Sequence, residues 1–227
     1  MVESAAPGDL EQVRTFVNTW WLPNDTRVPA DRLAELAADP AAWRAELPAI
    51  PLPAPGAGRA GVAGPGGSAE LVALREALRA SLGVERPVAL EEWLERYPLR
   101  ATFSGEPEAP AVELRPERDG PAGRLLALVA QAVWAGRWAR LKACPDCGWV
   151  FYDHSRNGAR RWCAMAPGGP GGRGCGSIAK VRAYRHRKRD IDTATGTDTG
   201  TGTDSGTGTD TGIGTGTSAR PGSDVTE

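Results

Sequence analysis

The sequence has few of the residues that catalysis usually requires, and it lacks long apolar runs. Its 227 residues include only two histidines, with no H-E-x-x-H pair and no glycine-rich phosphate loop after a strand pattern. No apolar run approaches the roughly 20 residues that a membrane helix needs, and the first residues lack the basic-then-apolar order of a signal peptide. We therefore expect a cytoplasmic protein that is not an enzyme and does not enter a membrane.

Charge is unevenly distributed, although the formal net charge of the chain is only −1. Residues 1–141 carry 15 arginines and 19 acidic residues, and residues 190–227 carry one arginine and seven acidic residues. Residues 142–189 carry 11 lysines or arginines against only Asp146 and Asp153. This basic segment is therefore the part expected to meet a polyanion.

Helical patterns dominate residues 1–141. Apolar residues recur at helical spacing, with proline or glycine near several ends, in six segments: 9–21, 29–40, 40–48, 68–83, 90–98 and 122–141. Residues 48–67 are so rich in proline and glycine that they predict a mobile loop. Loss of the helical period predicts two short strands, at Ala101–Ser104 and Ala111–Arg115. The sequence thus predicts a mostly helical N-terminal domain with a small β element.

The C-terminal residues 190–227 repeat threonine, glycine and aspartate in near-hexads. Calcium-binding glycine–aspartate repeats stack through a regular apolar position, and only Ile213 is available for that role here. We therefore expect a disordered, solvated tail.

The cysteines are the strongest functional signal. Cys144, Cys147, Cys163 and Cys175 make a C-x-x-C pair followed by gaps of 15 and 11 residues. In a reducing compartment this pattern indicates metal ligands rather than disulfides. Four thiolates around a tetrahedral Zn²⁺ leave no open position, so the predicted site holds one structural zinc ion and is not catalytic. An alternative fourth ligand, in place of Cys175, is His154 or His186.

The residues between the cysteines predict a treble-clef-like finger. Trp149–Asp153 reads as a strand, Asn157–Gly158 as a turn, and Arg160–Cys163 as the returning strand of a hairpin. A basic helix then runs from about Ile178 to Arg189. We expect four aromatic residues to form a small core around the metal: Trp149, Phe151, Trp162 and Tyr184.

The segment L-K-A-C-P-D-C-G-W-V-F-Y-D-H-S-R-N-G-A-R-R-W-C resembles the CGNR zinc-finger family, and the resemblance resumes at Cys175. The family's C-G-N-R tetrad is here Cys175-Gly176-Ser177-Ile178, and the gap before it is long. The upstream helical segment, with F-V-N-T-W near its start, is similar to the ABATE domain that precedes this finger. The resemblance implies a stress-induced bacterial transcription regulator.

The basic helix separates its residues by face. Val181 and Tyr184 are expected to face the finger, whereas Arg182, Arg185 and Arg189 follow another face at a spacing that suits phosphates or guanine edges. The predicted nucleic-acid contacts are Arg156, Arg160, Arg161, Lys180, Arg182, Arg185, Lys188 and Arg189.

Two other interpretations of the finger remain open. Exposed Trp149, Phe151 or Tyr152 would stack unpaired bases and favour RNA, whereas buried aromatics with an exposed arginine helix favour duplex DNA. A basic face could instead keep the finger soluble or dock onto the acidic N-terminal segment. The sequence therefore predicts a zinc-dependent DNA-binding transcription regulator, with an RNA-binding or protein-docking module as the alternative.

The sequence gives fewer indications of function for residues 1–141 than for the finger. Sensing of a small apolar ligand and dimerisation are both compatible with their composition. Trp20, Trp21, Trp43 and Trp93 could line an apolar pocket, although tryptophans at helical spacing are more often plain core. The overall prediction is a mainly α protein with a small β element, in which a helical N-terminal domain (1–141) precedes a zinc finger (142–189) and a tail (190–227).

Overall fold

The computed structural model describes residues 5–53, 67–106, 111–165 and 174–195. These residues are mainly helical, with three two-stranded antiparallel sheets among them. Contacts divide the chain into two units, Met1–Arg185 and His186–Glu227, and the first unit contains the N-terminal helices and the finger up to Arg185. The mainly α fold class is confirmed. The domain boundaries predicted at residues 141 and 189 stay predictions.

The first helix, α1 (Leu10–Val17), ends earlier than its apolar pattern predicts. Leu10, Val13 and Phe16 are buried as expected, but Trp20–Trp21 form strand β1, which pairs with β2 (Ala30–Asp31). The physical reason lies at Asn18, whose side-chain amide bonds both the carbonyl and the N–H of Val150. These two hydrogen bonds take the chain out of the helix and turn it toward the finger.

The next helices are short and amphipathic: α2 (Leu33–Ala38), α3 (Pro40–Glu46), α4 (Ser68–Ala80) and α5 (Glu91–Arg96), the last preceded by the 3₁₀ turn η1 (Val88–Leu90). Asp39 caps α3 by accepting hydrogen bonds from two backbone N–H groups, and Pro40 occupies the first turn. Helix α4 buries Leu71, Leu74 and Leu78 on one face. The loop predicted over 48–67 lies largely outside the described residues, which leave out 54–66.

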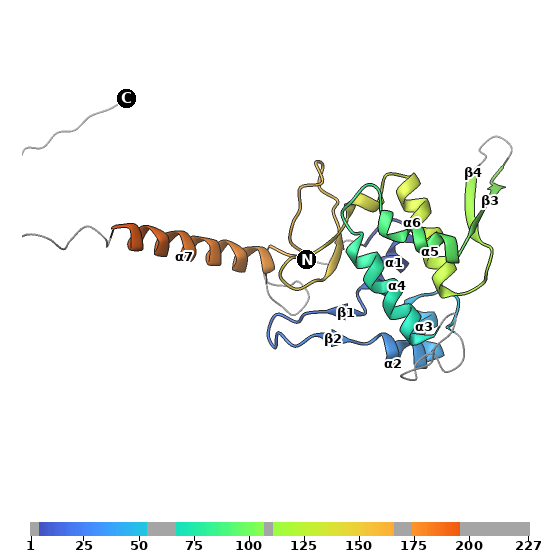
Figure 1. The fold of residues 1–227 in the computed structure, drawn as a ribbon, viewed down its shortest axis with the longest axis horizontal. Coiled ribbons are helices and arrows are strands. Elements are labelled where there is room, and N and C mark those ends of the chain that lie inside the picture. The colour runs from blue at the N-terminus through green and yellow to red at the C-terminus, as the bar shows by residue number, and fades with distance from the viewer. Residues whose placement is uncertain (1–4, 54–66, 107–110, 166–173, 196–227) are drawn as a thin grey trace, which may run out of the picture. The chain divides into compact units, whose positions relative to one another are not determined.

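The two predicted strands are confirmed. β3 (Leu99–Ser104) and β4 (Ala111–Pro116) form an antiparallel hairpin beside α6 (Pro121–Trp134), as Figure 1 shows. Gly123 of α6 permits this packing, because a Cβ there would lie 2.8 Å from both Pro116 and the Arg118 carbonyl oxygen. The 3₁₀ turn η2 (Trp138–Arg140) then leads into the finger, and the Trp138 indole N–H donates to the Ser81 carbonyl.

One apolar cluster joins α1, α4 and α6 with residues of the finger's first strands, Leu141, Val150 and Tyr152. A second, smaller cluster contains the four cysteines and Phe151, with Trp149 and Trp162 packed against it. The finger therefore rests on the helices through one face and encloses its own small core on another.

The finger's strands pair differently from the prediction. β6 (Val150–Tyr152) pairs with β5 (Leu141–Ala143), whereas Arg160–Cys163 has no strand conformation, so the predicted return strand is wrong. The reason is that β5 precedes the C-x-x-C turn directly and closes a tighter hairpin around it. Residues 154–163 then form an irregular loop stabilised by side chains.

Helix α7 (Cys175–Thr195) begins three residues before the predicted start. It also includes residues 190–195, so the prediction of a disordered tail is wrong for these six residues. The rest of the predicted tail, 196–227, lies outside the described residues. Among the helices of the described residues, none combines the length and apolarity needed to cross a membrane.

Candidate metal centre

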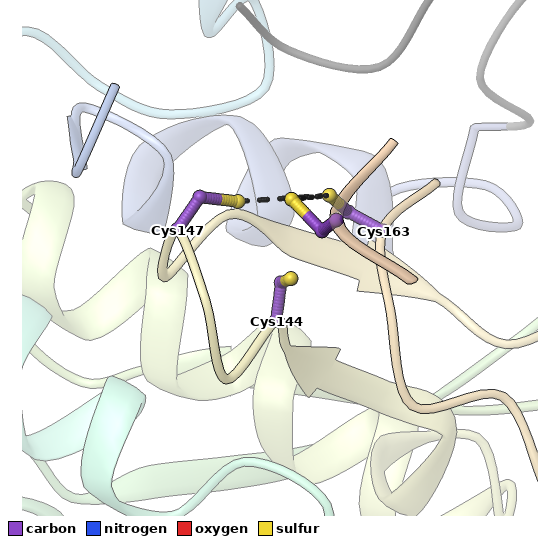
Figure 2. Close-up of side chains that lie close together, drawn as sticks. Cys144, Cys147 and Cys163 are labelled. Atoms are coloured by element: carbon purple, nitrogen blue, oxygen red, sulfur yellow. Dashed lines mark hydrogen bonds between the residues drawn. The ribbon is translucent and has the colours of Figure 1, made fainter. Parts of the chain in front are cut away.

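Four cysteine sulfurs converge at one buried point of the finger. The Sγ atoms of Cys144, Cys147, Cys163 and Cys175 all lie within 4.8 Å of one another, and all four residues are buried. Figure 2 shows the side chains of Cys144, Cys147 and Cys163 directed toward a common centre. The four cysteines predicted as ligands are thus brought together.

The sulfur positions fit a tetrahedral zinc ion. A Zn–S bond of about 2.3 Å places neighbouring sulfurs about 3.8 Å apart. The Cys147 and Cys163 sulfurs are 3.6 Å apart, and those of Cys163 and Cys175 are 3.7 Å apart. The four-thiol set is therefore consistent with one structural zinc ion, whose bonds would supply folding energy to a region with a small core.

Burial and mutual proximity oppose ionisation of most of these thiols. Hydrogen bonding with Cys144 raises the pKa of Cys147 to about 12 and also raises the pKa of Cys163. Burial raises the pKa of Cys175. Only Cys144 has a lowered pKa, because Cys147 and Cys163 hydrogen-bond its sulfur. Four thiolates can therefore coexist here only beside a cation.

The C-x-x-C turn is shaped by backbone bonds and one glycine. The Gly148 N–H donates to the Cys144 carbonyl at 2.8 Å, and the Cys144 N–H donates to the Trp149 carbonyl at 2.9 Å. Gly148 has φ +68°, and a Cβ there would lie 2.7 Å from the Trp20 ring. Glycine is thus required both by the turn and by the close approach of β1.

Cys163 is held in place by an arginine predicted to contact nucleic acid. The Arg160 guanidinium donates to the carbonyls of Trp162 and Cys163, and it lies 4.7 Å from the centre of the Phe151 ring. This side chain is half-buried. The structure therefore engages Arg160 in the finger itself.

Asp153 organises the loop that follows β6. Its fully buried carboxylate accepts hydrogen bonds from Lys142, Ser155 and the Arg160 backbone N–H. Burial alone would raise the pKa of Asp153, but the bonds from Ser155 and Lys142 hold this pKa well below its usual range. Arg140 adds donors to the carbonyls of Asp153 and Ser155. The D-x-S pattern of Asp153 and Ser155 is a local signal for such a turn.

Cys175 is the first residue of α7, and its neighbours explain how the altered tetrad still forms a turn. The Gly176 N–H donates to the Ala164 carbonyl at 2.9 Å, and a Cβ at Gly176 would lie 2.2 Å from the Met165 sulfur. The Ser177 hydroxyl donates to the Met165 carbonyl. Ser177, which stands at the family's asparagine position, therefore braces this turn.

The two histidines make other contacts. His154 is exposed, with Nε2 2.9 Å from the Ala5 carbonyl and its ring against Tyr152. His186 pairs with Asp190 on α7 at 2.9 Å. The buried four-cysteine cluster thus favours Cys175 over either histidine as the fourth ligand.

Residues far upstream complete the surroundings of the metal centre. Asn24 donates to the Cys175 sulfur at 3.1 Å, the Leu22 N–H donates to the Cys147 carbonyl at 2.8 Å, and Arg79 donates to the Gly148 carbonyl at 2.7 Å. The sequence analysis missed all three, because each lies more than 60 positions from its partner and no local pattern marks it. The finger is therefore built partly from the N-terminal segment.

The predicted tryptophan group serves mainly packing. Trp43 and Trp93 are buried in the helical core, and the Trp43 indole donates to the Ile50 carbonyl. Trp20 lies against the Arg79 guanidinium, and Trp21 packs edge-on against Trp149. The expectation of a small apolar ligand stays a prediction.

The remaining predicted nucleic-acid contacts are exposed: Arg156, Arg161, Lys180, Arg182, Arg185, Lys188 and Arg189. Arg182 is also paired with Asp146 of the C-x-x-C turn, at 2.9 Å. Val181 and Tyr184 were expected to pack on the finger, but they are 48% and 61% exposed, so that expectation is wrong. The small core therefore forms from Phe151, Trp149 and Trp162 without Tyr184.

The fold and the site define a chain that carries a four-cysteine zinc finger. Residues 140–188 match the family model of the CGNR zinc finger. No curated protein shows significant similarity to the chain. The resemblance of the upstream segment to the ABATE domain stays a prediction.

Proposed function

We propose that this protein is a zinc-dependent DNA-binding transcription regulator in which α7 makes the main contacts. The observation that carries the proposal is the exposed row of basic side chains that starts within two turns of the zinc ligand Cys175. The metal fixes the start of this helix, and exposed arginines and lysines on it suit phosphates and base edges. The exposed Arg156 and Arg161 add a second contact region.

The packing of three aromatic residues in and beside β6 supports duplex DNA over unpaired RNA. Phe151 and Tyr152 are buried, and Trp149 is half-buried against Trp21. Stacking of unpaired bases needs exposed aromatic faces, and these side chains are instead committed to packing. The proposal also includes a stress-response role, which rests on the family resemblance. It further includes an N-terminal part that senses a ligand or mediates dimerisation, which rests on the composition of residues 1–141.

The test compares duplex DNA with single-stranded RNA of equal length by fluorescence anisotropy between 50 and 200 mM salt. We expect the duplex to bind more tightly, with log K falling linearly against log salt. The double variant Arg185→Gln and Lys188→Gln should keep its zinc. The slope of log K against log salt should become shallower by about 0.9 for each side chain removed. These positions are chosen because Arg182 is already paired with Asp146.

The matched control removes two charges elsewhere. Arg86 and Arg115 are exposed in the N-terminal segment, so Arg86→Gln with Arg115→Gln should leave affinity and slope unchanged. Equal slopes for both double variants would contradict the role of α7. Tighter binding of the RNA would favour the RNA-binding alternative, and binding of neither would favour a protein-docking finger.

A further inference from the structure

The loop between β1 and β2 packs on the metal centre, although it lies more than 100 residues before the first cysteine. At its start, the Leu22 N–H donates to the Cys147 carbonyl at 2.8 Å. The loop then turns through a hydrogen bond from the Arg27 N–H to the Pro23 carbonyl at 3.0 Å. Arg27 has φ +54°, the only positive φ of a non-glycine residue among those described. Such backbone strain persists only where the surroundings hold it.

Asn24, within this loop, contacts a metal ligand. It is buried, and its Nδ2 lies 3.1 Å from the Cys175 sulfur. The Arg27 guanidinium donates to Asn24 Oδ1 at 3.2 Å. Because the oxygen accepts this bond, the amide is oriented with its N–H group toward the sulfur.

Arg27 also links the loop to the basic helix. The buried carboxylate of Asp146 pairs with Arg182 of α7 at 2.9 Å and lies 3.6 Å from Arg27. Asp146 belongs to the C-x-x-C turn, so one carboxylate joins the loop, the turn and the helix. Its Oδ2 is buried without a hydrogen-bond partner in the described residues. The positive charges of the two arginines therefore offset the cost of burying this carboxylate.

A hydrogen bond to Cys175 has a physical purpose when zinc is bound. Four thiolates and one Zn²⁺ carry a net charge of about −2 in a buried site, and an N–H donor offsets part of that charge. Outer-shell donors of this kind orient the ligand and tune the metal, and their loss typically costs about 10–100-fold in metal affinity.

We propose that Asn24 is a positioning residue of the metal centre, where it holds the Cys175 thiolate through an N–H to sulfur hydrogen bond. Arg27 orients the Asn24 amide and, with Asp146 and Arg182, ties the same loop to the start of α7. The N-terminal segment thus helps to position a metal ligand and the basic helix of the finger. This inference rests on the proposed zinc-binding function and deepens it.

The experiment uses the full chain and three variants: Asn24→Ala, Asn24→Asp and Asp25→Ala. Zinc affinity is measured by competition with a chromogenic chelator. Asn24→Ala should raise the zinc Kd about 10-fold and Asn24→Asp about 100-fold, because the second variant keeps the shape but places a carboxylate beside the thiolates. Asp25 is the exposed neighbour in the same loop, so Asp25→Ala should stay within about twofold of wild type.

A spectroscopic measurement separates positioning from a general loss of folding. Cobalt(II) replaces zinc, and the sulfur-to-cobalt charge-transfer bands are recorded, with far-UV circular dichroism as the folding control. Loss of a hydrogen bond makes the sulfur a stronger donor, so Asn24→Ala should shift these bands to lower energy at unchanged helix content. Asp25→Ala should not shift them.

Three other outcomes overturn the inference, and they differ from one another. Unchanged zinc affinity and cobalt bands in Asn24→Ala would refute the role of Asn24 while the metal centre stands. A variant that loses both helix content and metal would assign Asn24 to folding. A wild-type chain that binds neither zinc nor cobalt would remove the metal centre itself, and the inference with it.

Discussion

The molecule contains two cores that are stabilised in different ways. The helical core buries whole apolar faces, such as Leu71, Leu74 and Leu78 of α4, against α1 and α6. The finger core holds four cysteines and Phe151, with two half-buried tryptophans at its rim. Apolar burial scales with area, so the first core is stable through its size, whereas the second needs the strong bonds of a metal.

The difference also shows in how each core uses buried charge. Arg75 in the helical core is 2% exposed and pairs with Asp31 at 2.6 Å. In the finger, Lys142 and Asp153 form the corresponding pair, and Asp153 additionally organises the loop backbone. A small core cannot position its chain by packing alone, so hydrogen-bonded side chains take over that role.

Removal of the metal should have the largest effect and should separate the two cores. In Cys147→Ser, or in wild type with a chelator, we expect the backbone amides of residues 140–165 to lose their protection from hydrogen exchange. The amides of α1, α4 and α6 should keep theirs. Structural zinc contributes about 10–16 kcal/mol of apparent binding energy in isolated fingers. The measurement is amide hydrogen exchange resolved by segment. A finger that kept its protection would show that its contacts with the helices suffice without metal.

Truncation of the helical core should have the next largest effect. Leu74→Ala removes a fully buried side chain and should cost about 2–5 kcal/mol of unfolding free energy, measured by urea denaturation. Zinc content should remain at wild-type level, since the cysteine cluster does not include this residue. Val72→Ala on the exposed face of the same helix is the control, with an expected change of about 0.5 kcal/mol or less. Loss of zinc in Leu74→Ala would mean that the cores are not separable.

The smallest of the three effects concerns the ion pair of the helical core. Asp31→Asn removes one of the two carboxylates that pair with the buried Arg75 guanidinium and leaves only Glu76, so it should cost about 1–3 kcal/mol near pH 7. The hydrogen bond from Arg75 lowers the pKa of Asp31, so the wild-type advantage is complete above the ordinary value of 3.8 and is lost as the pH falls through the lower folded value. Wild type and variant are compared by urea denaturation at each pH, so that acid release of zinc affects both alike. A difference that persisted unchanged to pH 2 would assign the effect to packing.

Much of the architecture followed from local patterns. The apolar spacing of α4 and α6, the turn residues between β3 and β4, and the C-x-x-C knuckle each involve neighbours in sequence, so residue order alone identifies them. The sequence-based predictions were wrong where contacts between residues far apart in sequence determine the structure. Trp20 left the helical pattern because Asn18 bonds Val150, and Tyr184 stayed exposed because the finger core is completed without it.

What the sequence determined by itself is the set of four cysteines, the basic segment and the mainly helical character of the chain, because these depend on residue type and short spacing. Only the tertiary structure decided that β5 rather than Arg160–Cys163 pairs with β6, and that Asn24 reaches the Cys175 sulfur. Those contacts join residues up to 151 positions apart. The packing of two cores against each other brings such partners together, and no local pattern records it.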